Sequence, residues 1–253
     1  MAAAATVPPP DSQQPAPLSE PQRIIDTFIA PSKTFIDLRR NASWWGPYVL
    51  VIIVSFLFCY IVDQKVGFRK VTENVLEQSP KQAERIESLP ADQREKALQQ
   101  QTAGTKFFSY GISIIALLIY LIIAGVLYAT VKFGANADVQ FKTMFALVIY
   151  TRLPELLRAL LSALSLLAGV STDSFNIRNP LAVNPGYFID ASGSATLRAA
   201  LSTLDLITFW VLTLLALGIA SIAKVKRGTA FAIVFGWYVF AMLCIVALTA
   251  ATA

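Results

Sequence analysis

The sequence contains no histidine and only two cysteines among its 253 residues. The missing histidine excludes Ser-His and Cys-His catalytic pairs, His-ligated zinc and the commonest proton carrier near neutral pH. Cys59 and Cys244 both fall inside apolar runs, so they form neither a disulfide framework nor a zinc-binding CxxC pair. We therefore expect no enzyme activity, no cofactor and no bound metal.

Charged side chains are also scarce. They make up 15% of the residues, against 55% for hydrophobic ones, whereas a soluble domain is about one quarter charged. The formal net charge of +5 comes without a basic face interleaved with aromatic residues, so nucleic acid is not an expected partner. The expected partners are membrane lipids, and other membrane or membrane-associated proteins come second.

Long apolar runs fill most of the chain. Residues 41–62, 107–131 and 228–253 contain no Asp, Glu, Lys or Arg, and two further apolar segments carry only a few charges. A helix needs roughly 20 mostly apolar residues to cross a bilayer, where every backbone group must be paired internally. The sequence predicts an all-α polytopic membrane protein whose five transmembrane helices cover about residues 44–63, 107–131, 145–170, 200–222 and 229–250.

The segments outside these spans differ in composition. Residues 1–21, rich in Pro, Ala and Gln, predict a disordered tail ahead of a membrane domain over residues 22–253. The loop over residues 64–105 is expected to be helical, with helix starts at Ser79-Pro80 and Leu89-Pro90. Residues 171–198 contain turn signals and are expected to fold back over the outer ends of the helices.

Short amphipathic helices should precede the first span. Ser19 and Gln22 have capping-box spacing, which predicts a helix ending before Pro31. A second helix, capped by Ser32, is expected to bury its apolar side chains Phe35, Ile36 and Leu38. Both helices can lie in the headgroup plane or pack on the protein's own loops, and the sequence leaves these alternatives open.

Lys and Arg residues set the orientation. The N-terminal flank is basic, and the connection between spans four and five holds Lys224, Lys226 and Arg227 without an acid. This places the N-terminus in the cytoplasm and the C-terminus on the opposite side of the membrane. The loop over residues 64–105 is also rich in basic residues, so net charge, rather than their number, separates the two sides.

Ionisable residues inside two spans are the candidate functional residues. Arg152, Glu155 and Arg158 share one face of span three, and Asp205 lies early in span four. Such charges cost roughly 2.5–3.5 kcal/mol each on insertion scales, so they are paired, snorkelled or functional. Glu155 can neutralise one arginine or serve both, whereas the partner of Asp205 is not evident.

Pro154 breaks the helix within this cluster. Span three is therefore kinked at Pro154, or it starts there after a short interfacial segment over residues 141–150. A start near Leu153 would place the charges close to the cytoplasmic interface, where long arginine side chains can snorkel.

Small residues recur four apart in the last two spans, a spacing that lets helix backbones approach closely. This predicts a tight pair between spans four and five through Ala216, Ala220, Gly228, Ala232 and Gly236.

Several short motifs occur in a fixed order along the chain. They are Pro31-Ser32-Lys33-Thr34-Phe35, Trp44-Trp45-Gly46-Pro47, Tyr150-Thr151-Arg152-Leu153-Pro154, then Asp205, Leu206, Trp210 and Gly218, and finally Trp237. Together they resemble the Ypt-interacting-protein (Yip-domain) family, in particular its bacterial branch, over about residues 25–250. The resemblance implies a cytoplasmic N-terminus, five spanning helices and a C-terminus on the far side. Eukaryotic relatives are associated with Rab-type GTPases and vesicle traffic.

Two functional hypotheses follow. The first is a non-enzymatic integral membrane protein of the Yip-domain type that binds lipid or partner proteins in membrane organisation or trafficking. The alternative is a small-solute permease or channel that uses the buried charges of span three. The sequence contains no internal repeat and predicts no second broken helix, which counts against the alternative.

Overall fold

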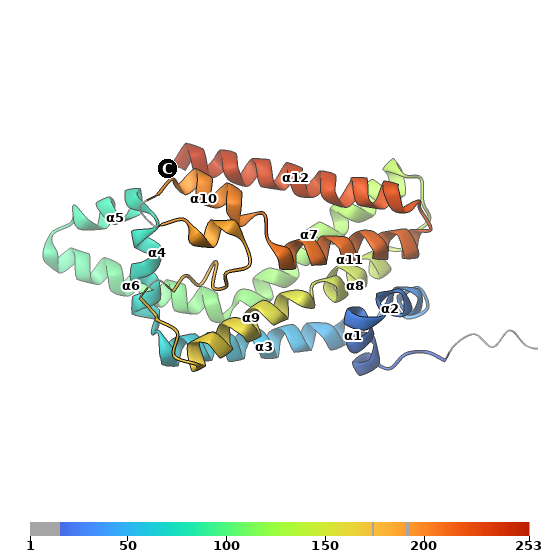
Figure 1. Ribbon diagram of the computed structural model, residues 1–253, viewed down its shortest axis with the longest axis horizontal. Coiled ribbons are helices and arrows are strands. Elements are labelled where there is room, and N and C mark those ends of the chain that lie inside the picture. The colour runs from blue at the N-terminus through green and yellow to red at the C-terminus, as the bar shows by residue number, and fades with distance from the viewer. Residues whose placement is uncertain (1–15, 174, 191–192, 253) are drawn as a thin grey trace, which may run out of the picture.

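Long apolar helices lying side by side make up most of the chain, and the computed structural model describes residues 16–173, 175–190 and 193–252 (Figure 1). No strand occurs among these residues. The elements in order are α1 (Glu20–Ile29), α2 (Pro31–Leu38), α3 (Trp45–Lys65), α4 (Phe68–Glu77), α5 (Pro80–Glu87), α6 (Ala91–Tyr110), α7 (Ile112–Ala129), the π-helical turn η1 (Thr130–Gly134), α8 (Phe141–Thr151), α9 (Pro154–Leu167), the 3₁₀ turn η2 (Pro185–Phe188), α10 (Ala195–Ser202), α11 (Leu206–Ala223) and α12 (Arg227–Thr252).

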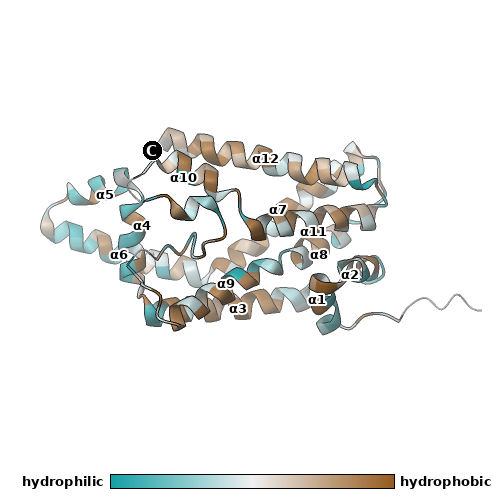
Figure 2. Cartoon of the chain, viewed as in Figure 1, coloured by the Kyte–Doolittle hydropathy of each residue, from teal (hydrophilic) through white to brown (hydrophobic). Residues whose placement is uncertain are grey.

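Four helices are long and apolar enough to cross a membrane. They are α3, α7 with its π-helical extension, α11 and α12. Figure 2 shows these helices as predominantly hydrophobic, whereas α4, α5 and most of α6 are hydrophilic. The all-α polytopic membrane fold expected from the sequence is confirmed.

The third apolar segment is interrupted, so neither of its halves, α8 or α9, is long enough to span a bilayer alone. The break lies at Arg152 and Leu153, and Pro154 occupies the first turn of α9, where its missing N–H removes no hydrogen bond. Residues Thr143 to Thr151 of α8 are all buried, and α8 packs against α7 and α11. The segment is therefore a kinked helix, and α8 is not a surface segment in the interface.

The fourth apolar segment is broken as well, which the sequence analysis did not expect. Helix α10 ends at Ser202 and α11 begins only at Leu206, so the continuous helix predicted over residues 200–222 is wrong. Asp205 causes the restart, because its side chain accepts a hydrogen bond from the Thr208 N–H at 2.8 Å and caps α11. An Asp at this position favours a helix start over a helix interior.

The N-terminal helices dock onto the bundle beside α8 and α11. Ser19 caps α1 through the Gln22 N–H, as the sequence predicts, while α2 begins at Pro31 without a side-chain cap, so Ser32 does not cap it. Helix α1 already starts at Glu20, inside the range expected to be a disordered tail, and residues 1–15 of that range lie outside the described residues.

Each docked helix has a buried face and an exposed one. Phe35 and Leu38 are buried, whereas Ile36 is 51% exposed, so the expected burial of Ile36 is wrong. Ile25 and Ile29 are also exposed, at 57% and 75%. The two arrangements left open by the sequence therefore apply to opposite faces, because one face packs on the protein and the other is free to meet lipid.

A buried arginine holds α1 against α2. The Arg23 side chain is 1% exposed, and its Nε donates to Asp37 Oδ2 at 2.6 Å. Burial alone would lower the pKa of Arg23, but the hydrogen bond and the negative charge of Asp37 outweigh it and raise that pKa. Glu20 adds a second ion pair to Arg23 and accepts a hydrogen bond from the Tyr150 hydroxyl at 2.7 Å, which links α1 to α8.

The charged segment over residues 64–105 is helical and projects from the opposite end of the bundle (Figure 1). Helices α5 and α6 start after Ser79 and at Ala91, as the two Pro positions predict. Helix α4 is anchored by a small core, in which Phe68 and Val71 pack with Val62, Leu166 and Phe175.

Helices α11 and α12 pack together, but through a different face of α12 than expected. Ala216 is fully buried on α11, and Ala230 and Val234 are buried on α12. Gly228, Ala232 and Gly236 are exposed, and a Cβ added at either glycine would meet nothing within 4 Å. The prediction that these three residues form the helix pair is therefore wrong. The aromatic side chains of Phe231 and Phe235 stack beside the true contact.

Candidate functional site

Two ion pairs lie among the helices of the bundle, with Asp205 buried and Arg152, Glu155 and Arg158 partly exposed. Arg152 Nη1 donates to Glu155 Oε1 at 2.7 Å, so Glu155 serves one of the two arginines. Arg158 Nη2 donates instead to Asp205 Oδ1 at 2.6 Å, which supplies the partner that the sequence did not reveal. Arg152 also lies over the ring of Tyr120, with its guanidinium carbon 5.4 Å from the ring centroid.

Asp205 joins its ion pair with Arg158 to the segment between α9 and α10. Its Oδ2 accepts a hydrogen bond from Asn184 Nδ2 at 3.3 Å, and Asn184 exchanges two hydrogen bonds with Asn179. Asp205 and Asn184 are 2% and 5% exposed. The segment between α9 and α10 therefore reaches a buried carboxylate through Asn184.

The depth of the second break follows from α12. The Tyr238 hydroxyl donates to the carbonyl of Thr203, just before Asp205. Tyr238 lies about 17 Å along α12 from Arg227 at a rise of about 1.5 Å per residue, roughly half of a bilayer core. Tyr120, the neighbour of Arg152, lies likewise within the middle turns of α7. Both contacts lie part-way along α7 and α12, away from the basic turn at Arg227.

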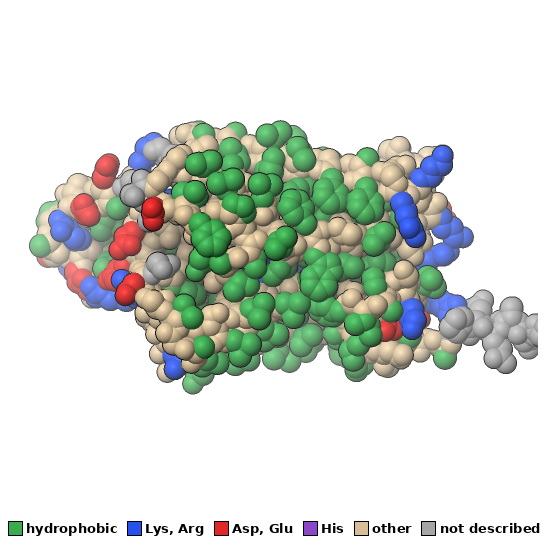
Figure 3. Space-filling view, in the orientation of Figure 1, with side chains coloured by type: hydrophobic (Ala, Val, Ile, Leu, Met, Phe, Trp, Pro, Cys, Tyr) green, Lys and Arg blue, Asp and Glu red, His purple; other side chains and the backbone are tan. Residues whose placement is uncertain are grey.

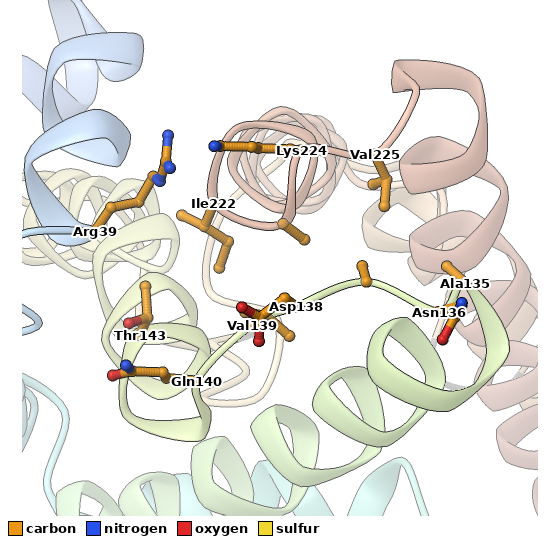
Figure 4. Close-up of a pocket in the computed structure, with 12 residues that line it drawn as sticks. Arg39, Ala135, Asn136, Asp138, Val139, Gln140, Thr143, Ile222, Lys224 and Val225 are labelled. Atoms are coloured by element: carbon orange, nitrogen blue, oxygen red, sulfur yellow. The ribbon is translucent and has the colours of Figure 1, made fainter.

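A second candidate site is a polar pocket of about 510 Å³ at the end of the bundle that carries α1 and α2. Figure 4 shows Arg39, which follows α2, and Lys224 of the α11–α12 turn extending into the same gap, with Asp138 below them. We call this the end pocket. Its lining residues are Arg39, Ala135, Asn136, Ala137, Asp138, Val139, Gln140, Thr143, Ile222, Ala223, Lys224 and Val225.

The start of α8 forms one wall of the end pocket. Gln140 is the N-cap of α8, and its side chain makes no capping hydrogen bond. The first N–H groups of a helix lack partners within the helix, and together with the helix dipole they attract anions. Arg39 and Lys224 bring two positive charges to the same space, against one carboxylate from Asp138.

Backbone strain is concentrated at the end pocket. Asn136 and Lys224 have φ values of 47° and 54°, and among the described residues they are the non-glycine residues with positive φ. Such left-handed conformations cost a β-carbon residue roughly 1–2 kcal/mol. The π-helical turn η1, another feature frequent at functional sites, leads directly into this loop.

Basic side chains gather around the end pocket, whereas both signs of charge mix at the opposite end of the molecule (Figure 3). Hydrophobic side chains cover the surface between the two ends (Figure 3). The described part of the chain begins at the basic end of the bundle and ends at the end where both signs of charge mix (Figure 1). This distribution is the one expected for a bundle that crosses a membrane with a basic end.

The residues that carry the family resemblance have structural roles. Phe35 and Pro47 are buried, Pro31 starts α2, and Trp45 is 60% exposed. Trp210 meets Phe28 edge-on at 5.9 Å, and Trp237 donates to the Thr130 hydroxyl at 3.0 Å. Gly218 lies where any Cβ would collide with Leu147 of α8, so only glycine permits this helix contact.

The model of the Yip1 domain matches residues 25–249. The chain belongs to the Yip1 domain family. Neither a curated protein nor a solved structure matches the chain. Family membership and the apolar helices together establish an integral membrane protein of the Yip1 domain type.

In this Yip1-domain protein the sequence analysis missed the end pocket. In the sequence alone, Lys224 indicates orientation, and Arg39 is one of the basic residues of the N-terminal flank. One signal was present: Asn136 and Asp138 fall in the short connection between two spans, and loops between rigid helices often carry binding residues. Among the described residues, no group of three or more Cys, Asp or Glu side chains is arranged to hold a metal.

Proposed function

We propose that this Yip1-domain protein is a non-enzymatic membrane component that binds anionic phospholipid headgroups at its basic end, as part of membrane organisation or trafficking. The observation that carries the proposal is the uncapped start of α8 opening into the end pocket beside Arg39 and Lys224. A phosphate group suits this combination of free N–H donors and two cations.

The apolar side chains around that end favour a lipid surface as the source of the phosphate. Ile25, Ile29 and Ile36 project from α1 and α2, and Trp45 is exposed at the start of α3. Exposed aliphatic and aromatic side chains beside basic residues are typical of segments lying at the headgroup level.

The proposal includes a topology. Five crossings, with α8 and α9 together forming the third, agree with the described chain starting and finishing at opposite ends of the bundle. The basic end faces the cytoplasm, and the arm of α4, α5 and α6 lies on the other side of a bacterial inner membrane.

Hydrogen exchange in lipid nanodiscs tests the headgroup proposal. We expect the first-turn amides of α8, Phe141 to Thr143, to exchange more slowly in phosphatidylglycerol than in phosphatidylcholine. The double variant Arg39→Gln/Lys224→Gln should abolish this difference, whereas Lys33→Gln, an exposed change on α2 outside the pocket, should preserve it. Equal exchange in both lipids, or protection that survives the double variant, would overturn the proposal.

A second candidate is a small-solute permease that uses the charged residues of the third and fourth apolar segments. The second helix break favours it, because transporters bind solutes at discontinuous helices near mid-depth. The Nε atoms of Arg152 and Arg158 are buried without a hydrogen-bond partner, so each is available to donate a hydrogen bond to a bound anion or water. Solute flux into proteoliposomes that is lost in Arg152→Ala would support this candidate over the first.

A further inference from the structure

Two hollows adjoin each other at the end of the bundle opposite the end pocket. The first, which we call the apolar groove, has a volume of about 680 Å³ and lies between α3, α6, α7 and α9. The second, which we call the basic hollow, has a volume of about 530 Å³ and lies between α4, α5, α10 and the end of α12. Val75 and Arg178 line both, so the two spaces meet at these side chains.

The apolar groove follows the depth of a membrane leaflet. At one end it is lined by Gln101 and Thr105 of α6, which belong to the polar part of that helix. At the other end it is lined by Ile112 and Ile115, in the apolar span of α7. Phe108, between them, is 62% exposed. A groove that changes from polar to apolar along its length fits an amphipathic molecule lying along the bilayer normal.

The basic hollow supplies positive charge beside the polar end of the groove. Lys81, Arg178 and Arg198 line it, and no Asp or Glu is among its lining residues. The carboxylates of Glu77, Asp173 and Asp190 line a third hollow, which adjoins the basic hollow at the shared residues Gln78, Asn176, Asn179 and Arg198 but includes neither Lys81 nor Arg178. Arg198 is held in place by hydrogen bonds to the carbonyls of Asp190 and Gln78.

We propose that the two hollows together form a binding site for one anionic phospholipid, with an acyl chain in the apolar groove and the headgroup phosphate at Arg178, Lys81 and Arg198. The ligand comes from the leaflet opposite the end pocket, so the site goes beyond the headgroup contact proposed above. Each hollow lies within the range of roughly 300–1,000 Å³ usual for ligand pockets.

Native mass spectrometry of the purified full-length protein tests the site with phosphatidylglycerol and phosphatidylcholine as probes. We expect one phosphatidylglycerol to be retained in preference to phosphatidylcholine. Arg178→Gln should weaken that retention at least about tenfold, because a charge-assisted contact to phosphate is lost. Arg85→Gln, an exposed change on α5 outside both hollows, should leave it unchanged.

A second variant tests the groove itself. Gly104 lines the groove, and a Cβ at this position meets nothing within 4 Å, so Gly104→Phe can fill the space without a backbone collision. The change should remove phosphatidylglycerol retention without lowering the melting temperature, because glycine is a weak helix former. Gly125→Phe, on α7 outside the groove and equally unobstructed, is the matched control.

The outcomes separate this site from the end pocket. Retention that is lost in Arg178→Gln and Gly104→Phe but kept in Arg39→Gln/Lys224→Gln supports the inference, whatever the fate of the proposed function. Equal retention of the two lipids, or retention unaffected by Arg178→Gln and Gly104→Phe, would overturn it.

Discussion

Arg158 and Asp205 join two interrupted spans, with Nη2 of Arg158 lying 2.6 Å from Oδ1 of Asp205. Arg158 lies in the second turn of α9, shortly after the break at Arg152 and Leu153, and Asp205 is the cap that restarts α11. The same carboxylate therefore ends one irregular segment and neutralises a charge on the other.

Removing the carboxylate should be costly. Asp205→Leu leaves the Arg158 charge unpaired inside the bundle and removes the cap of α11, so we expect a loss of about 3 kcal/mol in unfolding free energy. The double variant Arg158→Leu/Asp205→Leu should recover part of that loss, because no lone charge remains. Thermal unfolding in detergent measures both, and a double variant no more stable than Asp205→Leu would contradict the prediction.

The approach of α8 to α11 should depend on Gly218. Gly218→Ala places a Cβ against the side chain of Leu147, which is fully buried and cannot move away freely. We expect a loss of about 1–3 kcal/mol, the usual cost of overpacking. Gly236→Ala, in an apolar span but open space, should be neutral or slightly stabilising in the same unfolding assay. Equal effects of the two changes would argue against the close helix contact.

Strain at Lys224 should be separable from its charge. Lys224→Gly relieves a left-handed backbone and should stabilise the protein by about 1 kcal/mol while reducing the lipid-dependent protection of α8. Lys226→Gly removes the same charge nearby without relieving positive φ, and it should not stabilise the protein. A melting temperature that falls in Lys224→Gly would show that the side chain stabilises the turn.

Acid should loosen the charged arm. Arg69 Nη1 lies 2.9 Å from Glu95 Oε1, and this charged hydrogen bond holds the pKa of Glu95 below its ordinary value of 4.5. A carboxylate with a lowered pKa stabilises the fold above its unfolded pKa, and this contribution is lost as the pH falls through the lower folded value. We therefore expect the packing of α4 on α6 to loosen only below about pH 4.5.

Electron paramagnetic resonance can follow that change. Spin labels at Lys70→Cys and Lys96→Cys, in a variant with Cys59 and Cys244 replaced by Ala, report the distance between α4 and α6. The distance distribution should broaden in acid, and Glu95→Gln should remove this dependence by being broad at every pH. A distribution that stays narrow in Glu95→Gln would show that the ion pair does not hold the arm.

Much of the helical architecture could be predicted from the sequence, since lipid imposes strict local requirements. A charge-free run near 20 residues has few alternatives to a spanning helix, so α3, α7 and α12 were expected close to their positions. Local helix signals also worked: Ser19 caps α1, and Pro80 opens α5. These predictions need only neighbouring residues.

The remaining features depend on residues far apart in the chain. The partner of Asp205 is Arg158, which is fixed by how α9 lies against α11 and not by spacing along either helix. The spacing of Gly228, Ala232 and Gly236 was misleading, because a small-residue face shows where close approach is allowed and not where it occurs. For α11, Asp205 ahead of an apolar run was a usable cap signal, which hydropathy alone concealed.

The interruptions between α8 and α9 and between α10 and α11 also affect how the molecule responds to force. Near the middle of the bundle, α3, α7 and α12 continue without interruption, while each of the other two columns passes through a short turn, and the Arg158–Asp205 ion pair links the two columns. Short turns and side-chain contacts deform more readily than a continuous α-helix. Thickening or curving of the surrounding bilayer would therefore bend the molecule at this level, which makes the Arg158–Asp205 link its mechanical joint.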